Sequence, residues 1–222
     1  MDEHPIIRAV ERIKAGIGDF FYDAFVNLNV NDISGDYVEF GSWGGTTLKL
    51  AHEATNATGK PRHLWAFDSF EGLPEATDPR DYHPGWRPGS PAGQGGVDKF
   101  HAACEEHGIP RDAYTAVAGY YDQSLPSIGD GEPRDIALAY IDCNMYSSAV
   151  TVFEFLEPRL KHGMILAFDD YFCWSPSEVS GERSALHEFE QAHPEWSFLR
   201  YQNIARAGLS FAVERSDWHQ RR

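Results

Sequence analysis

The sequence predicts an α/β fold built on a doubly wound, mostly parallel sheet, and three observations lead to it. Short apolar runs typical of buried parallel strands alternate with segments of helical periodicity up to residue 168. Two segments of alternating apolar residues, 197–201 and 209–213, follow this region. Several of the apolar runs end in an acidic residue, and open α/β sheets bind ligands at the carboxyl ends of their strands. Such alternation is typical of a Rossmann-like architecture.

The first part of the chain predicts two helices and two strands. Apolar residues recur at helical spacing over 6–17, which predicts an amphipathic helix. The apolar run at 36–41 predicts the first strand, and the glycines behind it predict a sharp turn into a helix over 46–57. The run at 64–68 predicts the second strand.

The later part of the chain repeats this alternation. Apolar runs that are too short for helices predict strands, and periodic segments closed by glycine or proline predict helices. In chain order the expected elements are helix 97–107, strand 114–118, strand 136–141, helix 147–161 with a kink at Pro158, strand 164–168, helix 184–193, and the closing strands 197–201 and 209–213.

Residues 1–222 are expected to form a single domain with an N-terminal helical segment over 1–34 and a long loop over 71–96. The loop holds five prolines and six glycines, which is the composition of turns. A loop of this length in a compact domain is usually functional or disordered. The apolar rings of Tyr82 and Trp86 favour a lid that closes over a site, and a flexible insertion is the alternative.

The charge and the cysteine content of the chain limit the classes of binding partner and the cellular compartment that we expect. The chain has 19 Lys and Arg against 34 Asp and Glu, a net charge of −15, which argues against nucleic acid or an anionic membrane as the main partner. Its three cysteines form no CxxC pair, which favours a reducing cytoplasm over a disulfide framework. No apolar stretch is long enough for a transmembrane helix, and residues 1–4 lack the character of a signal peptide.

The turn after the first strand predicts a binding site for a small anion. The spacing of Gly41, Gly44 and Gly45 is not that of a dinucleotide or P-loop motif. Asp68, 23 residues past Gly45, ends the second strand and can accept both hydroxyls of a ribose. Glu39 can accept from an ammonium group. Together these features suggest S-adenosyl-L-methionine, whereas the turn alone is compatible with a connection that binds nothing.

Acidic residues end two further strands. Asp142 follows the run at 136–141, and the adjacent Asp169 and Asp170 follow the run at 164–168. Three carboxylates at neighbouring strand ends can hold a hard divalent cation through oxygen ligands. The alternative is that these acids cap helices or are solvated, as single Asp residues often are.

Four segments resemble the macrocin O-methyltransferase family, class I S-adenosylmethionine-dependent enzymes that methylate sugar or phenolic hydroxyls of natural products. The resemblance spans roughly residues 35–215 and is carried by DYVEFG at 36–41, FDSFEGLP at 67–74, IDCNMY at 141–146 and FDDY at 168–171. The second and fourth of these segments are specific when they occur together.

The resemblance implies a seven-stranded sheet whose last strand is antiparallel, and a homo-oligomer with a small-molecule hydroxyl acceptor. It implies Mg²⁺ held by Asp142, Asp169 and Asp170. The cofactor-binding residues that we expect from the resemblance and from the glycine turn are Glu39, Gly41, Ser42, Gly45, Thr46, Asp68, Ser69, Gly119, Tyr120 and Asp142.

The chain departs from the family pattern at two places. Gly44 follows the tryptophan of the first turn where the family often has arginine, and Asn144 replaces an acid that is a proposed general base in some relatives. Asparagine cannot take a proton, so Asp169 is our first candidate for the base and Asp142 the second. His83 and His187 are weaker substitutes.

The sequence leaves open which chemical class of hydroxyl accepts the methyl group. A sugar hydroxyl of a glycosylated secondary metabolite is the first expectation, and a catechol or phenol is the alternative. Tyr82, Trp86 and Trp174 favour a bulky or planar acceptor. Two other functions compete: a metal-dependent hydrolase, which would leave Glu39 and Asp68 unexplained, and a non-catalytic subunit that retains the cofactor fold.

Overall fold

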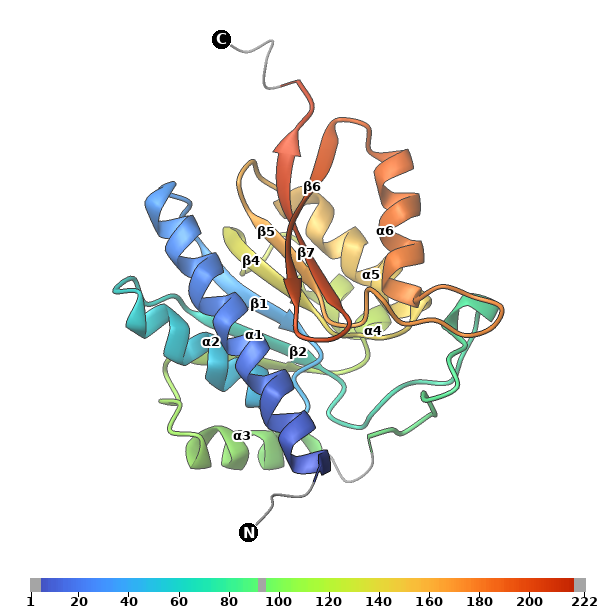
Figure 1. Cartoon of the computed structure of the whole chain (residues 1–222), viewed down its shortest axis with the longest axis horizontal. Coiled ribbons are helices and arrows are strands. Elements are labelled where there is room, and N and C mark those ends of the chain that lie inside the picture. The colour runs from blue at the N-terminus through green and yellow to red at the C-terminus, as the bar shows by residue number, and fades with distance from the viewer. Residues whose placement is uncertain (1–4, 92–94, 218–222) are drawn as a thin grey trace.

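The computed structural model describes residues 5–91 and 95–217. The signal-peptide assessment at residues 1–4 and Gly93 of the expected lid therefore lie outside the described residues. Seven strands form one sheet in the order β3-β2-β1-β4-β5-β7-β6, with helices on both faces (Figure 1). The strands are β1 (Asp36–Phe40), β2 (Leu64–Asp68), β3 (Tyr114–Ala118), β4 (Ile136–Ile141), β5 (Ile165–Phe168), β6 (Trp196–Ile204) and β7 (Gly208–Arg215).

The sheet is parallel except at its last strand. β1 pairs in parallel with β2 and β4, β2 with β3, and β4 with β5, whereas β7 runs antiparallel to both β5 and β6. The expected seven-stranded, doubly wound fold with an antiparallel last strand is confirmed. The parallel strands therefore place their carboxyl ends on one edge of the sheet, where Asp68, Asp142 and Asp169 follow or end β2, β4 and β5.

Each face of the sheet packs against its own helices. Side chains alternate along a strand, so Tyr37 and Tyr140 face one helix layer while Val38 and Ile141 face the other. The first layer comprises α1 (Pro5–Val30), α2 (Thr46–Ala57) and α3 (Gly96–Glu106), and the second comprises α4 (Tyr121–Ile128), α5 (Tyr146–Leu156) and α6 (Gly181–Ala192). None of the helices in the described part of the chain combines the length and apolar character needed to cross a membrane.

Several predicted elements differ from the structure in their bounds. The helix expected over 6–17 continues to Val30 as α1, and the helix expected over 184–193 begins at Gly181 as α6. The expected helix 147–161 ends at Leu156, and Pro158 lies in a separate 3₁₀ turn, η2 (Glu157–Arg159), because proline lacks the N–H that continues a helix. Helix α4 was not predicted, since its eight residues carry too few turns for a periodic signal and include Pro126. The two closing strands extend further than expected in both directions.

The loop expected to be a lid is tied to the body of the protein. The Leu73 N–H donates to the carbonyl of Ser90, which closes the base of the loop at 2.9 Å. At its tip, the 3₁₀ turn η1 (Pro79–Asp81) carries the buried Asp81, whose carboxylate accepts from the backbone N–H of Ser147 in α5 at 2.8 Å. Arg80 pairs with Glu188 of α6 at 2.5 Å. The described part of the loop is thus anchored to α5 and α6. A closing motion of the loop over a site stays a prediction.

Candidate functional site

A cavity of about 480 Å³ lies at the carboxyl ends of β1, β2 and β4, a size typical of small-molecule sites. Its walls come from the strand ends, the start of α4, the first turns of α5 and the base of the 71–96 loop. Among the residues expected at the site, those that line it are Gly41, Asp68, Ser69, Tyr120 and Asp142, with Asn144 beside them.

Gly41 is required by the close approach of two strand ends. Its φ is +101°, and a Cβ there would lie 2.0 Å from the carbonyl oxygen of Asp142. No L side chain fits this position, so the backbone of β1 and that of β4 meet directly at the cavity.

Asp68 organises the first turn through backbone hydrogen bonds. Its Oδ2 accepts from the N–H groups of Ser42 at 2.7 Å and Trp43 at 2.9 Å, and its Oδ1 accepts from the Phe70 N–H at 2.7 Å. Trp43 is held at a φ of +35°, which is strained for a bulky residue. A carboxylate has about four acceptor positions, and the Ser69 hydroxyl also reaches Oδ1 at 3.5 Å, so two ribose hydroxyls can bind Asp68 only if some of these bonds are released.

Glu39 is completely buried behind Gly41, on the side of the sheet that α1 and α2 cover. Tyr37 donates a hydrogen bond to its Oε2 at 2.8 Å, and burial raises the pKa of Glu39 to about 7. Its Oε1 and the hydroxyl of Ser42 are buried without a hydrogen-bond partner. Such unpaired atoms are costly, and they mark a place where a donor from a ligand would be stabilising.

The other expected cofactor residues flank the cavity. Gly45 is the N-cap of α2 at a φ of +71°, and Thr46 begins that helix, so its first N–H groups point toward the turn. Gly119 ends β3 at a φ of +132° and donates its N–H to the carbonyl of Asp68 at 3.0 Å. These residues, with Glu39 and Ser42, lie beside or behind the residues that line the cavity.

The strand-end acids form a cluster that includes one acid the sequence reasoning missed. Asp142, Asp170 and Glu182 each bring one carboxylate oxygen within 4.8 Å of the others. Burial, with Asp169 and Asp170 nearby, raises the pKa of Asp142 well above its usual range. The hydroxyl of Tyr140 donates to Oδ1 of Asp169, and burial raises the pKa of Asp169 to about 6.

Glu182 is completely buried in the first turn of α6. Its Oε1 accepts from the N–H groups of Cys143 at 3.1 Å and Asn144 at 3.0 Å, and its Oε2 accepts from the Asp170 N–H at 3.1 Å. In the sequence it is only an acid near the start of a helix, where acids commonly stabilise the helix dipole. No sequence signal separated it from that ordinary role.

Asn144 also takes part in the cluster, because its side-chain amide donates to Oδ2 of Asp170. The two histidines named as substitute bases lie elsewhere. His83 packs on Trp86 within the loop, with 4.5 Å between ring centroids, and His187 contacts Gln191 on α6. Neither histidine lines the cavity, and Asp169 and Asp170 also stand outside its lining, although Asp170 is bound by Asn144, which lines it.

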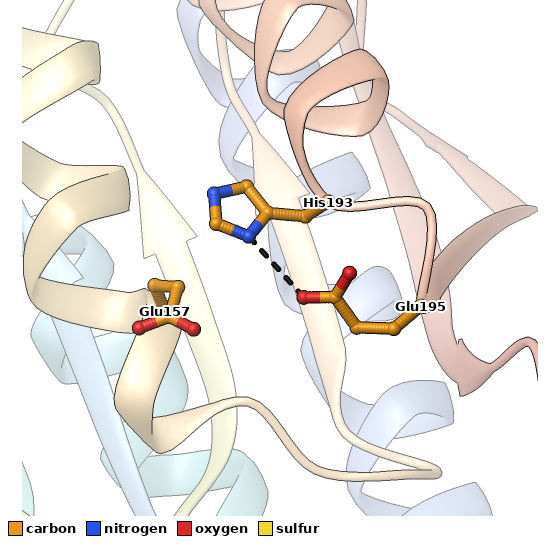
Figure 2. A group of neighbouring side chains, drawn as sticks. All are labelled: Glu157, His193 and Glu195. Carbon is orange, nitrogen blue, oxygen red and sulfur yellow. Dashed lines mark hydrogen bonds and ion pairs between the residues drawn. The ribbon is translucent and has the colours of Figure 1, made fainter.

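A second group of metal-ligating side chains lies at the opposite edge of the sheet. Figure 2 shows Glu157, His193 and Glu195. Nδ1 of His193 lies 3.3 Å from Oε1 of Glu195. Glu157 follows α5, and the other two precede β6, so all three are at the amino-terminal edge of the parallel strands. They are therefore separate from the cavity.

Comparisons with known proteins are consistent with this site. Residues 19–195 match the profile of the macrocin-O-methyltransferase (TylF) family. The 8-demethyl-8-(2,3-dimethoxy-alpha-L-rhamnosyl)-tetracenomycin-C 4'-O-methyltransferase of Streptomyces olivaceus is 29% identical over 163 residues, which are 71% of this chain and 58% of the relative. The mycinamicin III 3''-O-methyltransferase of Micromonospora griseorubida is 24% identical over 175 residues, 72% of this chain and 62% of the relative. The matches thus span less than two thirds of the length of these curated relatives.

Solved structures share the fold. The O-methyltransferase NovP superposes with a TM-score of 0.70 at 19% identity, covering 90% of this chain and 80% of NovP. The calicheamicin methyltransferase CalS11 superposes with a TM-score of 0.68 at 22% identity, covering 95% of this chain and 80% of CalS11.

Proposed function

Because the chain belongs to the macrocin-O-methyltransferase family, we propose that it transfers a methyl group from S-adenosyl-L-methionine to a hydroxyl of a small natural product. The family match confirms the resemblance found in the sequence. By their names, one relative is the 4'-O-methyltransferase of a rhamnosyl tetracenomycin and the other is the 3''-O-methyltransferase of mycinamicin III. A sugar hydroxyl of a glycosylated secondary metabolite is therefore the acceptor we propose.

One observation carries the proposal. A single cavity joins the first turn and Asp68, which suit a cofactor, to the strand-end acid Asp142, which suits an acceptor site. Methyl transfer needs the donor and the acceptor oxygen held in line and close together, and a shared cavity meets that requirement.

The cofactor residues follow from the sequence expectation and the observed positions. Asp68 would accept the ribose hydroxyls in place of N–H groups of the first turn, and the unpaired Oε1 of Glu39 would accept from the ammonium group. Ser69, Gly119 and Tyr120 would lie around the adenosine. We assign further contacts to the turn and to the strand-end acid, at Gly41, Ser42, Gly45, Thr46 and Asp142.

The carboxylates at the ends of β4 and β5 suit a hard divalent cation such as Mg²⁺, which prefers oxygen ligands. Asp142 and Asp170 already converge without it. When bound, the cation would supply electrophilic polarisation of the acceptor hydroxyl and so lower its pKa.

Asp169 is the group we propose for taking the acceptor proton, with Asp142 second. The Tyr140 hydroxyl occupies Oδ1 of Asp169, which leaves Oδ2 to receive a proton. A base works best when its pKa lies near the operating pH, and burial raises the pKa of Asp169 to about 6. Asn144 orients Asp170 through its amide and holds no proton-accepting group.

The test is a methyl-transfer assay on the purified protein with S-adenosyl-L-methionine, Mg²⁺ and a panel of glycosylated aglycones and catechols. We expect one CH₂ unit to be added to a sugar hydroxyl, detected by mass spectrometry, and Asp169→Asn to abolish this product while S-adenosylhomocysteine still binds in calorimetry. A product with catechols alone would move the acceptor class to phenols. A protein that neither binds S-adenosylhomocysteine nor methylates any acceptor would refute the proposal. Homo-oligomer formation and a cytoplasmic location stay predictions.

A further inference from the structure

We propose that the acceptor carries a flat ring and an anionic group, and that exposed aromatic rings and three arginines beside the end of β5 bind them. The residues of this surface, which we call the acceptor platform, are Tyr171, Phe172, Trp174, Arg183, Arg200 and Arg206. The inference rests on the proposed function, from which the hydroxyl acceptor comes, and it narrows the substrate class of that function.

The rings of the platform directly follow the acids at the end of β5. Trp174 is 50% exposed, although tryptophan is usually well buried in folded proteins. Phe172 lies beside it, with 5.8 Å between the ring centroids. An antiparallel bridge between Trp174 and Val179, and a hydrogen bond of 2.9 Å from the Ser175 N–H to the Glu178 carbonyl, hold the backbone that carries the indole. An exposed indole on a fixed backbone offers a stacking face to a flat ring.

Two arginines from different elements lie over these rings. Arg183, in the first turn of α6, places its guanidinium carbon 5.5 Å from the centre of the Tyr171 ring and 5.9 Å from that of Trp174. Arg200, in β6, lies 5.9 Å from the centre of the Phe172 ring. A guanidinium group over an aromatic ring keeps its N–H donors free at its edge, where a carboxylate or a phosphate can bind them.

The third arginine joins the platform to the strand-end acids. Arg206 lies in the turn between β6 and β7, next to Ala207, whose carbonyl accepts from the Phe172 N–H at 2.8 Å. The charge of Arg206 acts on the carboxylate of Asp169 and on the thiol of Cys173. Arg206 therefore stands between the rings and the place proposed for the acceptor hydroxyl.

None of the three guanidinium groups makes an ion pair with another residue in the described part of the chain. Arg200 donates to the neutral amide oxygen of Asn203 at 2.7 Å. The charges that act on the Tyr171 hydroxyl are those of Arg183 and Arg200 and that of one acid, Glu190. In a chain of net charge −15, three arginines without an ion pair around one exposed surface form a local positive region that attracts an anion.

The acids at the ends of β4 and β5 explain why an anionic acceptor would need these arginines. The charges of Asp169, Asp170 and Glu182 all act on Asp142, and such a group of acids repels an approaching anion. A nearby cation offsets that repulsion, because the interaction between two charges grows as their distance falls. A neutral acceptor would gain little from the arginines, so their position predicts a preference for an anionic one.

Two sources of acceptor share this chemistry. One is a glycoside whose flat aglycone carries a carboxylate or a phenolate, and the other is a sugar linked to a nucleoside through a diphosphate. Both carry a ring and an anionic group on the same molecule as a sugar hydroxyl. Two pairs of probes distinguish them, because each pair compares a charged molecule with a neutral one of similar shape: naphthoate with naphthamide, and uridine diphosphate with uridine.

Calorimetric titration of the full chain with these probes, in the presence of saturating S-adenosylhomocysteine and Mg²⁺, tests the anionic group. In at least one pair we expect the charged probe to bind at least about tenfold more tightly than the neutral one, and the difference to shrink as the salt concentration rises. A preference in one pair identifies the source of the anion. Equal binding of charged and neutral probes in both pairs overturns the inference.

Arginine variants show whether the platform causes this preference. Arg200→Gln and Arg206→Gln should each lower the affinity for the charged probe about fivefold and keep that for the neutral probe within about twofold. Arg134→Gln, which removes an exposed charge before β4, should change neither affinity. A preference that both platform variants retain in full overturns the inference.

Trp174→Leu tests the stacking ring. Stacking does not depend on the charge of the probe, so this variant should weaken the charged and the neutral probe of the preferred pair by the same factor, about tenfold. Unchanged affinity for both probes overturns the role of the ring. The replaced side chains Trp174, Arg200 and Arg206 are exposed, so the variants should keep the Tm of the wild type. A protein that does not bind S-adenosylhomocysteine refutes the proposed function itself, whereas one that binds it without preferring an anion refutes only this inference.

Discussion

The affinity for the cofactor should increase as the pH rises, because Glu39 loses its proton. Burial raises the pKa of Glu39 to about 7, and the neighbouring hydroxyl groups, that of Ser42 first and then those of Tyr37 and Thr47, only partly oppose this effect. A neutral carboxyl cannot balance an ammonium group, so the binding-competent form is the ionised one. Between pH values of about 6 and 7.5 the ionised fraction rises from about a tenth to about three quarters, and affinity should rise roughly eightfold.

The stability of the ligand-free protein should change in the opposite sense. An acid whose pKa is higher in the folded than in the unfolded state keeps its proton on folding. The contribution of the protonated Glu39 to the free energy of unfolding is fully present below a pH of about 4.5 and is lost as the pH rises through about 7. The rise of this pKa from about 4.5 to about 7 corresponds to a loss of up to about 3 kcal/mol in the free energy of unfolding.

Calorimetric titration with S-adenosylhomocysteine, together with urea unfolding at each pH, measures both effects. The ligand's amino group, which titrates near a pH of about 8, is still about three quarters protonated at pH 7.5, so its own titration reduces the expected rise in affinity only slightly. Glu39→Gln should remove both dependences, whereas Glu53→Gln on the exposed side of α2 should leave them intact. If wild type and Glu39→Gln showed the same pH dependence of affinity and stability, the reasoning about this buried carboxyl would be refuted.

Three further variants test the packing around the site. Gly181→Ala should lower the free energy of unfolding in urea by at least about 3 kcal/mol, because its Cβ would meet backbone at 2.2 Å, whereas Gly44→Ala, with no atom within 4 Å, should change it by less than about 0.5 kcal/mol. Asp81→Asn keeps one acceptor oxygen and turns the other into an NH₂ group, so the N–H donors either of the loop or of α5 lose their acceptor, and hydrogen exchange and proteolysis within 72–90 should accelerate, by a local cost of about 2 kcal/mol. Asn144→Asp replaces an amide hydrogen bond by repulsion between two carboxylates, so the metal-free Tm should fall at pH 8 and much less at pH 5. Equal effects of the two glycine variants would contradict the argument from the backbone contact at Gly181. Unchanged hydrogen exchange in the loop would contradict the anchoring role of Asp81. A loss of Tm in Asn144→Asp that is the same at both pH values would contradict the argument from charge repulsion.

The sheet could be predicted because its central parallel strands, β1, β4 and β5, are buried on both faces. Burial on both faces demands a short, nearly continuous apolar run, as at Ile136–Ile141, and such a run is visible without any tertiary knowledge. The short helix α4 lacked an equivalent signal, since eight residues with an internal proline show little periodicity. The loop at 71–96 was recognised by composition, yet its anchoring by Asp81 depends on a contact 66 residues away along the chain.

Site residues could be predicted where an acid ends a strand. They could not be predicted where the role of a residue depends on a contact with a residue far away in the sequence. Asp68, Asp142 and Asp170 follow from strand ends that share one edge of the sheet. Glu182 is 12 residues from Asp170, on a helix whose approach is fixed by a glycine contact, and no local pattern reports such a distance. The unpaired Oε1 of Glu39 is likewise visible only once the surrounding donors have been placed.

The adjacent acids Asp169 and Asp170 illustrate why a sequence motif does not by itself give a ligand set. Neighbours in the chain can have different partners, because β5 ends at Phe168 and the two acids lie in the bend that follows it. The structure gives Asp169 a hydrogen bond from Tyr140 and Asp170 a hydrogen bond from Asn144. An acid from a helix, Glu182, then stands closer to Asp170 and Asp142 than its place in the sequence would suggest. The asparagine at 144 is compatible with catalysis, because Asp169, whose Oδ2 is not used by Tyr140, is the group we propose for taking the proton.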